Sequence, residues 1–395
     1  MEDPFSICPH ATVCNGCPDM NTPYEEQIGR KKDRVVEVLK PFTDYVEMVP
    51  AHALSFYRNR ADFWFSPTRQ LGYRSKENPY SGIPVPECQL VSPRAQNLYQ
   101  TLEKRFHSNT WPPYSVLEHQ GFLRYATVRE SKTSGKLLLI LNTFTRTPED
   151  EERITGLAQE LLSERLADGI IWMHNPHFND AVQGDTIKTW GEKELVEDMS
   201  GIPFHYNSSC FFQTNPRMAE KVQEHVVQCI QEIQPAPRVL DLYCGVGLFA
   251  IPLIQKGFWV KGIEMNTESI GYARQNAQKL DLNGNSYSFE IGDVPKILQE
   301  MEKTDEQYDT IIFDPPRSGL SKKIWRRALR LKPTQLLYVA CRLSSLERDL
   351  EWLGEYAVFD ITSARAFDLF PHTPHVETVV DIRVNATKDY PKGGF

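Results

Sequence analysis

Two patterns of hydrophobic and polar positions divide the chain into regions of different structure. Over residues 58–141, short runs alternate apolar and polar residues, and proline and glycine separate the runs, which predicts a β-rich region. From Val239 onward, strand-like apolar runs alternate with runs at helical spacing, which predicts a doubly wound, mostly parallel α/β sheet. Ahead of both regions, residues 24–39 carry apolar side chains on one helical face and predict a helix that Pro41 ends.

The length of the chain indicates more than one domain. Its 395 residues exceed the usual size of a single domain. We expect a cysteine-containing loop over residues 1–20, a helix and a β-rich central domain over 21–205, and the α/β domain over 206–395. The first residues show no basic segment followed by an apolar core, and no apolar run is long enough to span a bilayer. We therefore expect a cytoplasmic protein without membrane contact.

The turn after the first strand of the α/β region has the pattern of a nucleotide-type site. Gly245, Gly247 and Ala250 match G-x-G-x-x-A, in which small residues permit a tight turn and a close approach of the backbone to a ligand. Glu264 lies at the tip of the next predicted strand, where a carboxylate can accept hydrogen bonds from ribose hydroxyls. The pattern favours a nucleoside-type cofactor and does not say which one.

Three further strand ends carry residues of chemical interest. Asp314 ends a buried strand and precedes a rigid Pro-Pro turn, and Arg317 stands where enzymes that methylate exocyclic amines commonly have an aromatic residue. Cys341 lies between a strand and a helix, where a helix N-terminus favours the thiolate, although a lone buried cysteine is more often inert. Glu377 begins an apolar strand, where partial burial would raise its pKa toward the range of a general base.

Cysteines cluster near the N-terminus. Cys8, Cys14 and Cys17 form a C-x5-C-x2-C pattern in a loop rich in proline and glycine, and Cys88 is the best candidate for a fourth ligand. In a reducing compartment such a cluster indicates metal rather than disulfides. Four thiolates suit either tetrahedral zinc or an iron–sulfur cluster, and the spacing alone leaves both open.

Charge constrains how the chain would bind nucleic acid. The net charge is −8, so any RNA contact requires locally concentrated basic residues. Residues 56–76 combine five basic residues with one acidic residue and several aromatic ones, as single-stranded RNA recognition does. The same pattern also fits a sheet with core aromatics and solvated arginines. The basic segment 322–330 is likewise either an RNA contact or a solvated helix face.

Together these motifs resemble the S-adenosylmethionine-dependent RNA uracil-C5 methyltransferase family. The matching segments are FFQTN at 211–215, DLYCGVG at 241–247, FDPPRSGL at 313–320 and FPHTPHVETVV at 370–380, together with Glu264 and Cys341. The N-terminal cysteines and Cys88 resemble the iron–sulfur branch that modifies 23S rRNA. The resemblance implies a [4Fe–4S] cluster on Cys8, Cys14, Cys17 and Cys88. It also implies that Gln213, Tyr243, Glu264 and Asp314 contact S-adenosylmethionine.

The resemblance further implies a covalent mechanism. The Cys341 thiolate attacks C6 of uracil, C5 of the resulting enolate takes the methyl group, and Glu377 removes the C5 proton before Cys341 leaves. The target base must leave its stack to reach the site. The expected partner is RNA, with 23S rRNA first and a tRNA T-loop uridine as the main rival, bound by a monomer through the central domain.

Two departures from the family pattern keep other functions open. The family usually has Asn after the nucleophile, where this chain has Arg342, and only seven residues precede Cys8, so the small N-terminal β-barrel of many members is not expected. A catalytically inactive iron–sulfur RNA-binding protein is therefore one alternative. A nicotinamide-dependent oxidoreductase would also satisfy the glycine pattern with a distal Glu264, but it leaves Cys341 and Glu377 without a role.

Overall fold

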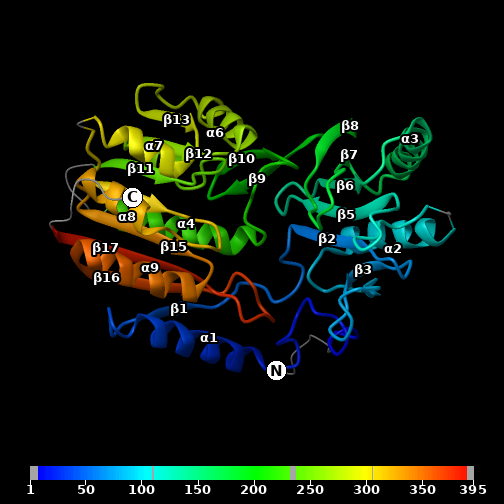
Figure 1. Cartoon of the computed structure of the whole chain (residues 1–395), viewed down its shortest axis with the longest axis horizontal. Helices are drawn as coiled ribbons and strands as arrows, with labels where there is room; N and C mark the ends of the chain where they lie inside the picture. Colours follow the sequence, from blue (N-terminus) through cyan, green and yellow to red (C-terminus); the bar gives the residue numbers. More distant parts are fainter. Residues whose placement is uncertain (1–7, 109–110, 232–236, 305, 389–395) are drawn as a thin grey trace.

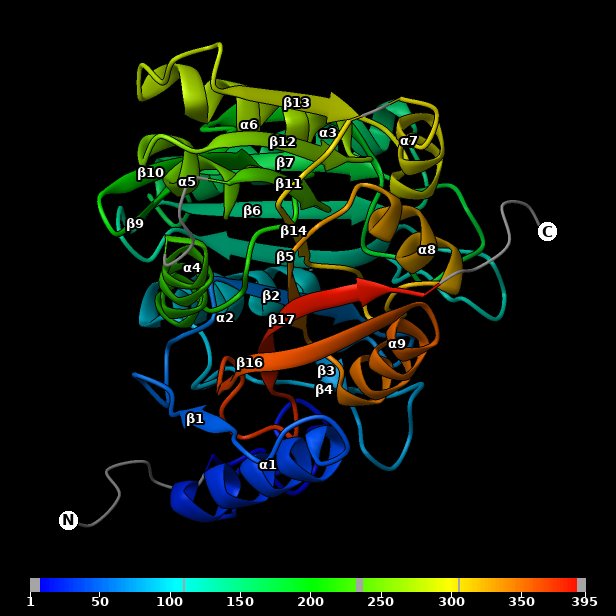
Figure 2. The same cartoon turned by 90° about the vertical axis from the view of Figure 1, so that its left-hand side faces the viewer.

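A computed structural model describes residues 8–108, 111–231, 237–304 and 306–388. Its largest feature is an eight-stranded sheet with the strand order β1-β16-β17-β15-β14-β11-β12-β13, and Figure 2 shows these strands running from β13 at the top to β1 at the bottom. Strands β15, β14, β11, β12 and β13 are parallel, and β17 is antiparallel to both of its neighbours. The predicted doubly wound α/β fold is thus confirmed.

Strands β16 and β17 are the longest of this sheet, and the edge strand β1 is the shortest. Their bounds are β1 Glu47–Val49, β11 Arg238–Leu242, β12 Trp259–Glu264, β13 Tyr287–Ile291, β14 Thr310–Phe313, β15 Gln335–Ala340, β16 Ala357–Phe367 and β17 Glu377–Thr387. Strands β14 and β15 are buried along their whole length, as expected for parallel strands covered on both faces.

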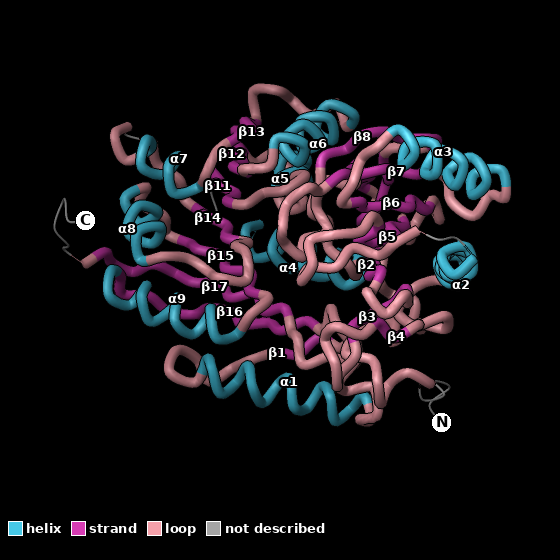
Figure 3. The backbone as a smooth tube through the Cα atoms, turned by 45° about the vertical axis from the view of Figure 1, so that its right-hand side comes forward, coloured by secondary structure: helices cyan, strands magenta, loops and turns pink. Residues whose placement is uncertain are grey.

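Helices cover both faces of the sheet, and Figure 3 shows the two layers. One face packs on helices α4 Pro216–Gln231, α5 Ala250–Gln255 and α6 Thr267–Lys279. The other packs on α1 Tyr24–Leu39, α7 Val294–Met301, α8 Lys322–Arg330 and α9 Leu343–Tyr356. Helix α1 has the bounds that the apolar spacing predicts, and it buries Gln27, Lys31, Val35 and Leu39 along one side.

The first helix and strand do not belong to the central domain as the sequence predicted. Strand β1 pairs in parallel with β16, and α1 packs against α9, so both extend the C-terminal sheet (Figure 1). The apolar face of α1 could pack against either domain. The buried ion pair between Lys31 and Asp368 holds the helix at the end of β16. Residues 24–49, which we expected in the central domain over 21–205, therefore belong with the C-terminal sheet.

The central domain is a seven-stranded sheet in the order β4-β3-β2-β5-β6-β7-β8. Its strands are β2 Arg60–Phe65, β3 Leu71–Arg74, β4 Gly82–Ile83, β5 Leu123–Glu130, β6 Leu137–Thr143, β7 Gly169–His174 and β8 Asp185–Gly191. Helices α2 Pro93–Ser108 and α3 Pro148–Ser163 pack on one face. Helix α3 begins with a capping box in which Thr147 and Asp150 satisfy each other's backbone N–H groups.

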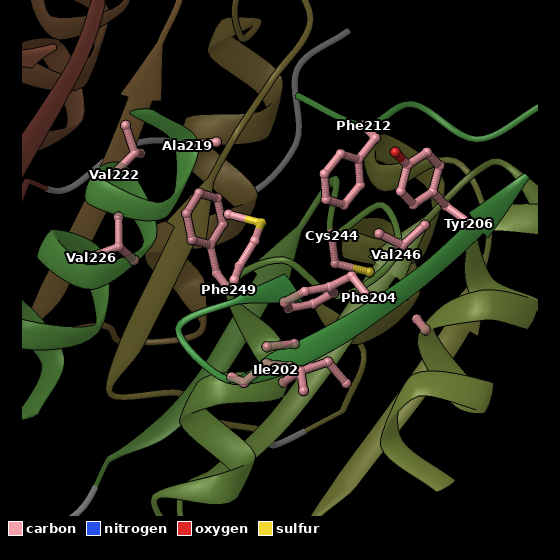
Figure 4. Packing of buried hydrophobic residues seen from close by; sticks show 14 of the residues in the cluster. Ile202, Phe204, Tyr206, Phe212, Ala219, Val222, Val226, Cys244, Val246 and Phe249 are labelled. Atoms are coloured by element: carbon pink, nitrogen blue, oxygen red, sulfur yellow. The ribbon is translucent and has the colours of Figure 1, made fainter. Parts of the chain in front are cut away.

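A hairpin joins the two domains. Strands β9 Glu194–Met199 and β10 Ile202–Asn207 form a separate two-stranded sheet that packs against α6 and α4. Its apolar residues share one core with β6 and β7 of the central sheet and with the α/β domain. Figure 4 shows Phe204, Tyr206 and Phe212 packed beside Cys244 and Val246 of the glycine turn. The two domains therefore meet through a continuous apolar interior.

Within the described part of the chain, no helix has the length and apolar character of a membrane span.

Candidate active site

Four of the predicted site residues stand at the carboxyl ends of adjacent parallel strands. Tyr243 follows the last residue of β11, Glu264 is the last residue of β12, Asp314 follows β14, and Cys341 follows β15. The strand order reverses between β11 and β14, and ligands of open α/β sheets bind at such a switch point. The fold thus brings these residues to one edge of the sheet.

The glycine turn leaves room for a ligand. Gly245 has φ +54°, and a Cβ placed on it would meet no atom within 4 Å. Gly247 has φ +92°, and a Cβ there would lie 2.8 Å from Ile251, so this glycine permits close packing of α5. Tyr243 also adopts a positive φ of 67°, which a bulky residue rarely does and which marks a functional turn. The open space lies at Gly245.

Three carboxyl groups gather beside this turn. Burial and then the charge of Glu264 raise the pKa of Asp314 to about 7. Burial and then Asp314 raise the pKa of Asp241 well above its usual range, although the backbone N–H of Ala250 opposes the shift. A ligand with positive charge and hydroxyl donors would relieve the repulsion among these groups. The site therefore fits a cationic nucleoside such as S-adenosylmethionine.

Cys341 and Glu377 lie side by side next to this carboxylate group. Burial, then Glu377, then Asp314 raise the pKa of the Cys341 thiol to about 11, while Arg317 lowers it. Burial and then Asp314 raise the pKa of Glu377 well above its usual range, and Arg317 again opposes the shift. Asp314 thus interacts with Glu264 on one side and with Cys341 and Glu377 on the other. The arrangement combines a nucleophile and a proton acceptor beside a cofactor pocket.

Gln213 is positioned by contacts between the two domains. The Asn59 side chain donates to the backbone oxygen of Gln213 at 3.0 Å, and its backbone N–H donates to the oxygen of Thr214 at 2.9 Å. Asn215 donates to the oxygen of Leu369 at 3.0 Å and accepts from the N–H of Met218 at the start of α4. The segment 211–215 is therefore held between the central sheet and the loop that leads to Glu377.

The cation that acts most strongly on the nucleophile is not its sequence neighbour Arg342. Arg342 is exposed at the N-cap of α9, and the cation that acts on the thiol is Arg317, from the loop after β14. That loop is held by buried Asp349, which accepts from the N–H of Leu320 at 2.6 Å and from the hydroxyl of Tyr338 at 2.6 Å. Sequence reasoning missed the roles of Asn59, Asp241 and Asp349. Only Asp241 carried a signal, through its place beside the glycine turn.

The four N-terminal and central cysteines line one cavity. Cys8, Cys14, Cys17 and Cys88 surround it together with Tyr73 and apolar side chains. Among the described residues, no three His, Cys, Asp or Glu side chains converge on one point as a single metal ion requires. A [4Fe–4S] cluster instead binds each thiolate at a different iron, so its ligands surround a larger volume. Four thiols around one cavity are a donor set that suits a tetrahedral zinc ion or an iron–sulfur cluster.

The arginines and aromatic residues of segment 56–76 serve mainly the central domain. Phe63, Trp64 and Phe65 are buried and Tyr73 is half-buried, and the guanidinium of Arg74 lies 4.0 Å from the Trp64 ring centroid and pairs with Asp180. Arg60 pairs with Asp62 at 3.0 Å. The helix over 322–330 is similar, because Lys322 pairs with Glu355 and Arg330 with Glu302. In both segments these residues therefore serve the packing and ion pairs of the folded protein, and not the alternative role of an RNA contact.

Comparisons with known proteins extend over nearly the whole chain. Residues 189–384 match a sequence model of the tRNA (uracil-5-)-methyltransferase family. An uncharacterized RNA methyltransferase of Clostridium acetobutylicum is 30% identical over 94% of this chain and 82% of its own. The tRNA (uracil(54)-C(5))-methyltransferase of Pyrococcus furiosus is 28% identical over 94% of this chain and 83% of its own. The crystal structure of Pyrococcus abyssi tRNA (uracil-54, C5)-methyltransferase in complex with S-adenosyl-L-homocysteine has a TM-score of 0.77 at 27% identity, covering 93% of this chain and 86% of that chain.

Proposed function

The chain belongs to the RNA uracil-5-methyltransferase family, and we propose that it methylates C5 of one uridine through a covalent adduct of Cys341. The observation that carries the mechanism is the pairing of Cys341 with Glu377 beside Asp314 at the carboxyl ends of the parallel strands. A thiolate and a carboxylate on one edge supply the nucleophile and the base that substitution at C5 of uracil requires.

Each residue has a distinct part in this proposal. Cys341 adds to C6 of the uracil ring, which makes C5 nucleophilic toward the methyl group. Glu377 then takes the C5 proton, and elimination of Cys341 restores the double bond and frees the product. Arg317 supplies positive charge toward both side chains and favours their ionised forms. When bound, S-adenosylmethionine supplies the electrophilic methyl group on a sulfonium.

The cofactor contacts follow from the pocket. We propose that Glu264 accepts hydrogen bonds from the ribose hydroxyls and that the backbone at Gly245 and Gly247 approaches the cofactor closely. Gln213, Tyr243 and Asp314 make the remaining contacts with the cofactor. The support is the open space at Gly245 and the group formed by buried Asp241 and half-buried Asp314 and Glu264, which a cationic ligand would stabilise. A nicotinamide cofactor carries a pyrophosphate, which three neighbouring carboxyl groups disfavour. This argues against the oxidoreductase alternative.

We further propose a [4Fe–4S] cluster on Cys8, Cys14, Cys17 and Cys88, with a structural role. The support is the single cavity that these four cysteines line. The cysteine loop touches two parts of the protein: Cys14 forms an isolated bridge with Ser75 of the central domain, and the N–H of Asp19 donates to the oxygen of His372 at 3.0 Å. A cluster there would fasten the loop before Glu377 to the central sheet.

Two RNA classes are candidates for the substrate. The cysteine pattern resembles the branch that acts on 23S rRNA, whereas relatives that match most of the chain are named tRNA (uracil(54)-C(5))-methyltransferases. The mechanism is the same for both RNAs, so the substrate depends on RNA shape and must be tested on both.

The test is methyl transfer from labelled S-adenosylmethionine to unmodified transcripts of 23S rRNA and of tRNA, side by side. We expect label in 5-methyluridine of one transcript and none with Cys341→Ala, which should still bind S-adenosylmethionine. Cys229→Ala, which removes a buried thiol elsewhere, is the matched control and should retain transfer. Tight cofactor binding by the wild type without transfer to either RNA would favour an inactive RNA-binding protein.

A further inference from the structure

This acidic protein needs local groups of unpaired cations in order to bind RNA phosphates. The net charge is −8, and several cations of the two basic segments are paired with carboxylates within the protein, namely Arg60, Arg74, Lys322, Arg327 and Arg330. Such paired cations contribute little to phosphate binding, because contact with a phosphate would require them to give up a carboxylate. RNA must therefore be held mainly by cations that lack such partners.

Cations of this kind gather around His375, in the loop just before Glu377. His375 is exposed, and the charged groups that act on it most strongly are all cations, namely Arg317, Lys31, Arg58 and Arg34. Lys31 is neutralised by a buried ion pair with Asp368 at 2.6 Å. Arg58 is directed toward the cysteines and Tyr57. Arg34 and Arg317 remain as exposed charges.

Neither of these two arginines has a carboxylate partner within salt-bridge distance among the described residues. Arg34 donates through Nη1 to the backbone oxygen of Pro374 at 2.8 Å, a contact that leaves its charge uncompensated and holds it against the loop of His375. Arg317 lies on the exposed loop after β14. The imidazole of His375 packs edge-on against Phe370, and within the described structure its ring nitrogens make no hydrogen bond. The ring is free to contact an anion.

Arg342 adds a further exposed charge next to the nucleophile. It follows Cys341 directly, and the described residues offer its side chain no ion pair. Ser345 connects it to Arg317, because the Ser345 N–H donates to the oxygen of Arg342 at 3.2 Å and its hydroxyl donates to the oxygen of Arg317 at 2.8 Å. Ser345 thus links the backbone at Arg317 to the backbone at Arg342, next to Cys341.

We infer that Arg34, Arg317, Arg342 and His375, the cationic rim, form a binding site for RNA backbone phosphates at the mouth of the active site. The rim would hold the phosphates next to the target nucleotide, so that its uracil reaches Cys341 and Glu377. Arginine suits this task because its planar guanidinium can donate two hydrogen bonds to one phosphate. The inference rests on the proposed function for the identity of the target base. The rim also gives Arg342 a role outside the chemistry of the thiol.

The first experiment measures binding of a fluorescein-labelled oligouridylate as a function of salt concentration, with no methyl transfer required. The variants are Arg34→Gln and Arg342→Gln, with Lys322→Gln as the matched control because that exposed lysine is already paired with Glu355. Each lost phosphate contact should reduce the slope of log affinity against log salt by about 0.7. Affinity at low salt should fall about tenfold for each rim variant and stay unchanged for Lys322→Gln.

Two further readouts separate a lost contact from a disturbed fold. Arg34→Lys keeps the charge and should retain most of the salt slope, and affinity for S-adenosylmethionine should be equal in all variants. Wild-type slopes in both Arg34→Gln and Arg342→Gln would overturn the rim, even if the enzyme methylates RNA. Reduced slopes in a protein that methylates neither 23S rRNA nor tRNA transcripts would support the rim and contradict the proposed function.

Discussion

Cys341 and Glu377 are neighbours because β15 and β17 pair in a fixed antiparallel register. Ala340, the last residue of β15, lies opposite Thr378, which places the next residue of one strand beside the previous residue of the other. The two side chains therefore share one buried environment, and each disfavours the charged form of the other. In the free protein this environment favours the protonated form of both groups, and a ligand that changes the charge around them would change that balance.

The first prediction concerns the reactivity of Cys341 in the free protein. Because burial and Glu377 raise the thiol pKa to about 11, the thiolate fraction should rise about tenfold per pH unit through neutral pH. Alkylation of Cys341 by iodoacetamide, followed by peptide mass spectrometry, should therefore be slow at pH 7 and accelerate without a plateau up to pH 10. A plateau near neutral pH would show that the thiol is already activated without ligand.

The second prediction separates the proposed roles of the pair. Glu377→Gln should allow attack and methyl transfer but block removal of the C5 proton, because the amide cannot accept that proton as a base. A covalent protein–RNA adduct should then accumulate on a denaturing gel with ordinary uridine RNA. The wild type should form a stable adduct only with 5-fluorouridine RNA, and Cys341→Ala with neither. If Glu377→Gln releases methylated RNA at the wild-type rate, another residue is the base.

The third prediction links the cofactor pocket to stability. The folded-state pKa of Asp314 is about 7, above the ordinary aspartate value of 3.8, so ionisation opposes folding as pH rises from about 4 to 7. Asp314→Asn removes this cost, and we expect it to stabilise the protein by about 4 kcal/mol at pH 8 with little effect at pH 4. Urea unfolding at the two pH values measures the difference, and affinity for S-adenosylmethionine should fall. Equal stabilisation at both pH values would exclude ionisation as the cause.

Much of the candidate site could be predicted from the sequence, because its residues mark strand ends. Glu264, Asp314 and Cys341 each end an apolar run, and parallel strands bring their carboxyl ends to one edge. The antiparallel β17 places Glu377 there too, although a sequence pattern shows the strand and not its direction. The site could therefore be located without knowledge of its internal distances.

The features that escaped prediction depend on contacts between distant parts of the chain. The pattern of α1 defines an apolar face but not the sheet that covers it, and burial of Lys31 against Asp368 could not be inferred from either segment. The aromatic residues around Arg74 have the composition of an RNA-binding surface. Only the burial of Trp64 and the Asp180 partner identify them as parts of a folded sheet.

The fourth prediction tests the cysteine cavity. Protein purified without oxygen should contain about four iron and four sulfide ions per chain and absorb near 400 nm if the proposed cluster is present. Cys88→Ala should lose the iron and lower the thermal midpoint, because the cavity then lacks a ligand and the loop before Glu377 loses its attachment. Cys210→Ala, at another buried cysteine, should keep the iron. Zinc without iron in the wild type would contradict the cluster.

The last prediction concerns the ion pair that attaches α1 to the active-site loop. Lys31 Nζ lies 2.6 Å from Asp368 Oδ1 and 3.0 Å from the oxygen of Phe370, and Tyr24 donates to the other carboxylate oxygen at 2.9 Å. Both side chains of the ion pair are almost fully buried. Lys31→Met leaves the Asp368 charge without its partner, and we expect a loss of about 3 kcal/mol in the free energy of unfolding.

The double variant distinguishes attraction within the pair from loss of packing. Lys31→Met with Asp368→Asn removes both charges, so it should recover part of the stability that Lys31→Met loses, as measured by urea unfolding. Because residues 368–376 lead to Glu377, the methyl-transfer rate should fall in Lys31→Met and recover in parallel. Lys221→Met, at an exposed pair with Glu224, should change neither quantity. Equal losses in the single and double variants would mean that Lys31 acts through its packed hydrocarbon chain and not through its charge.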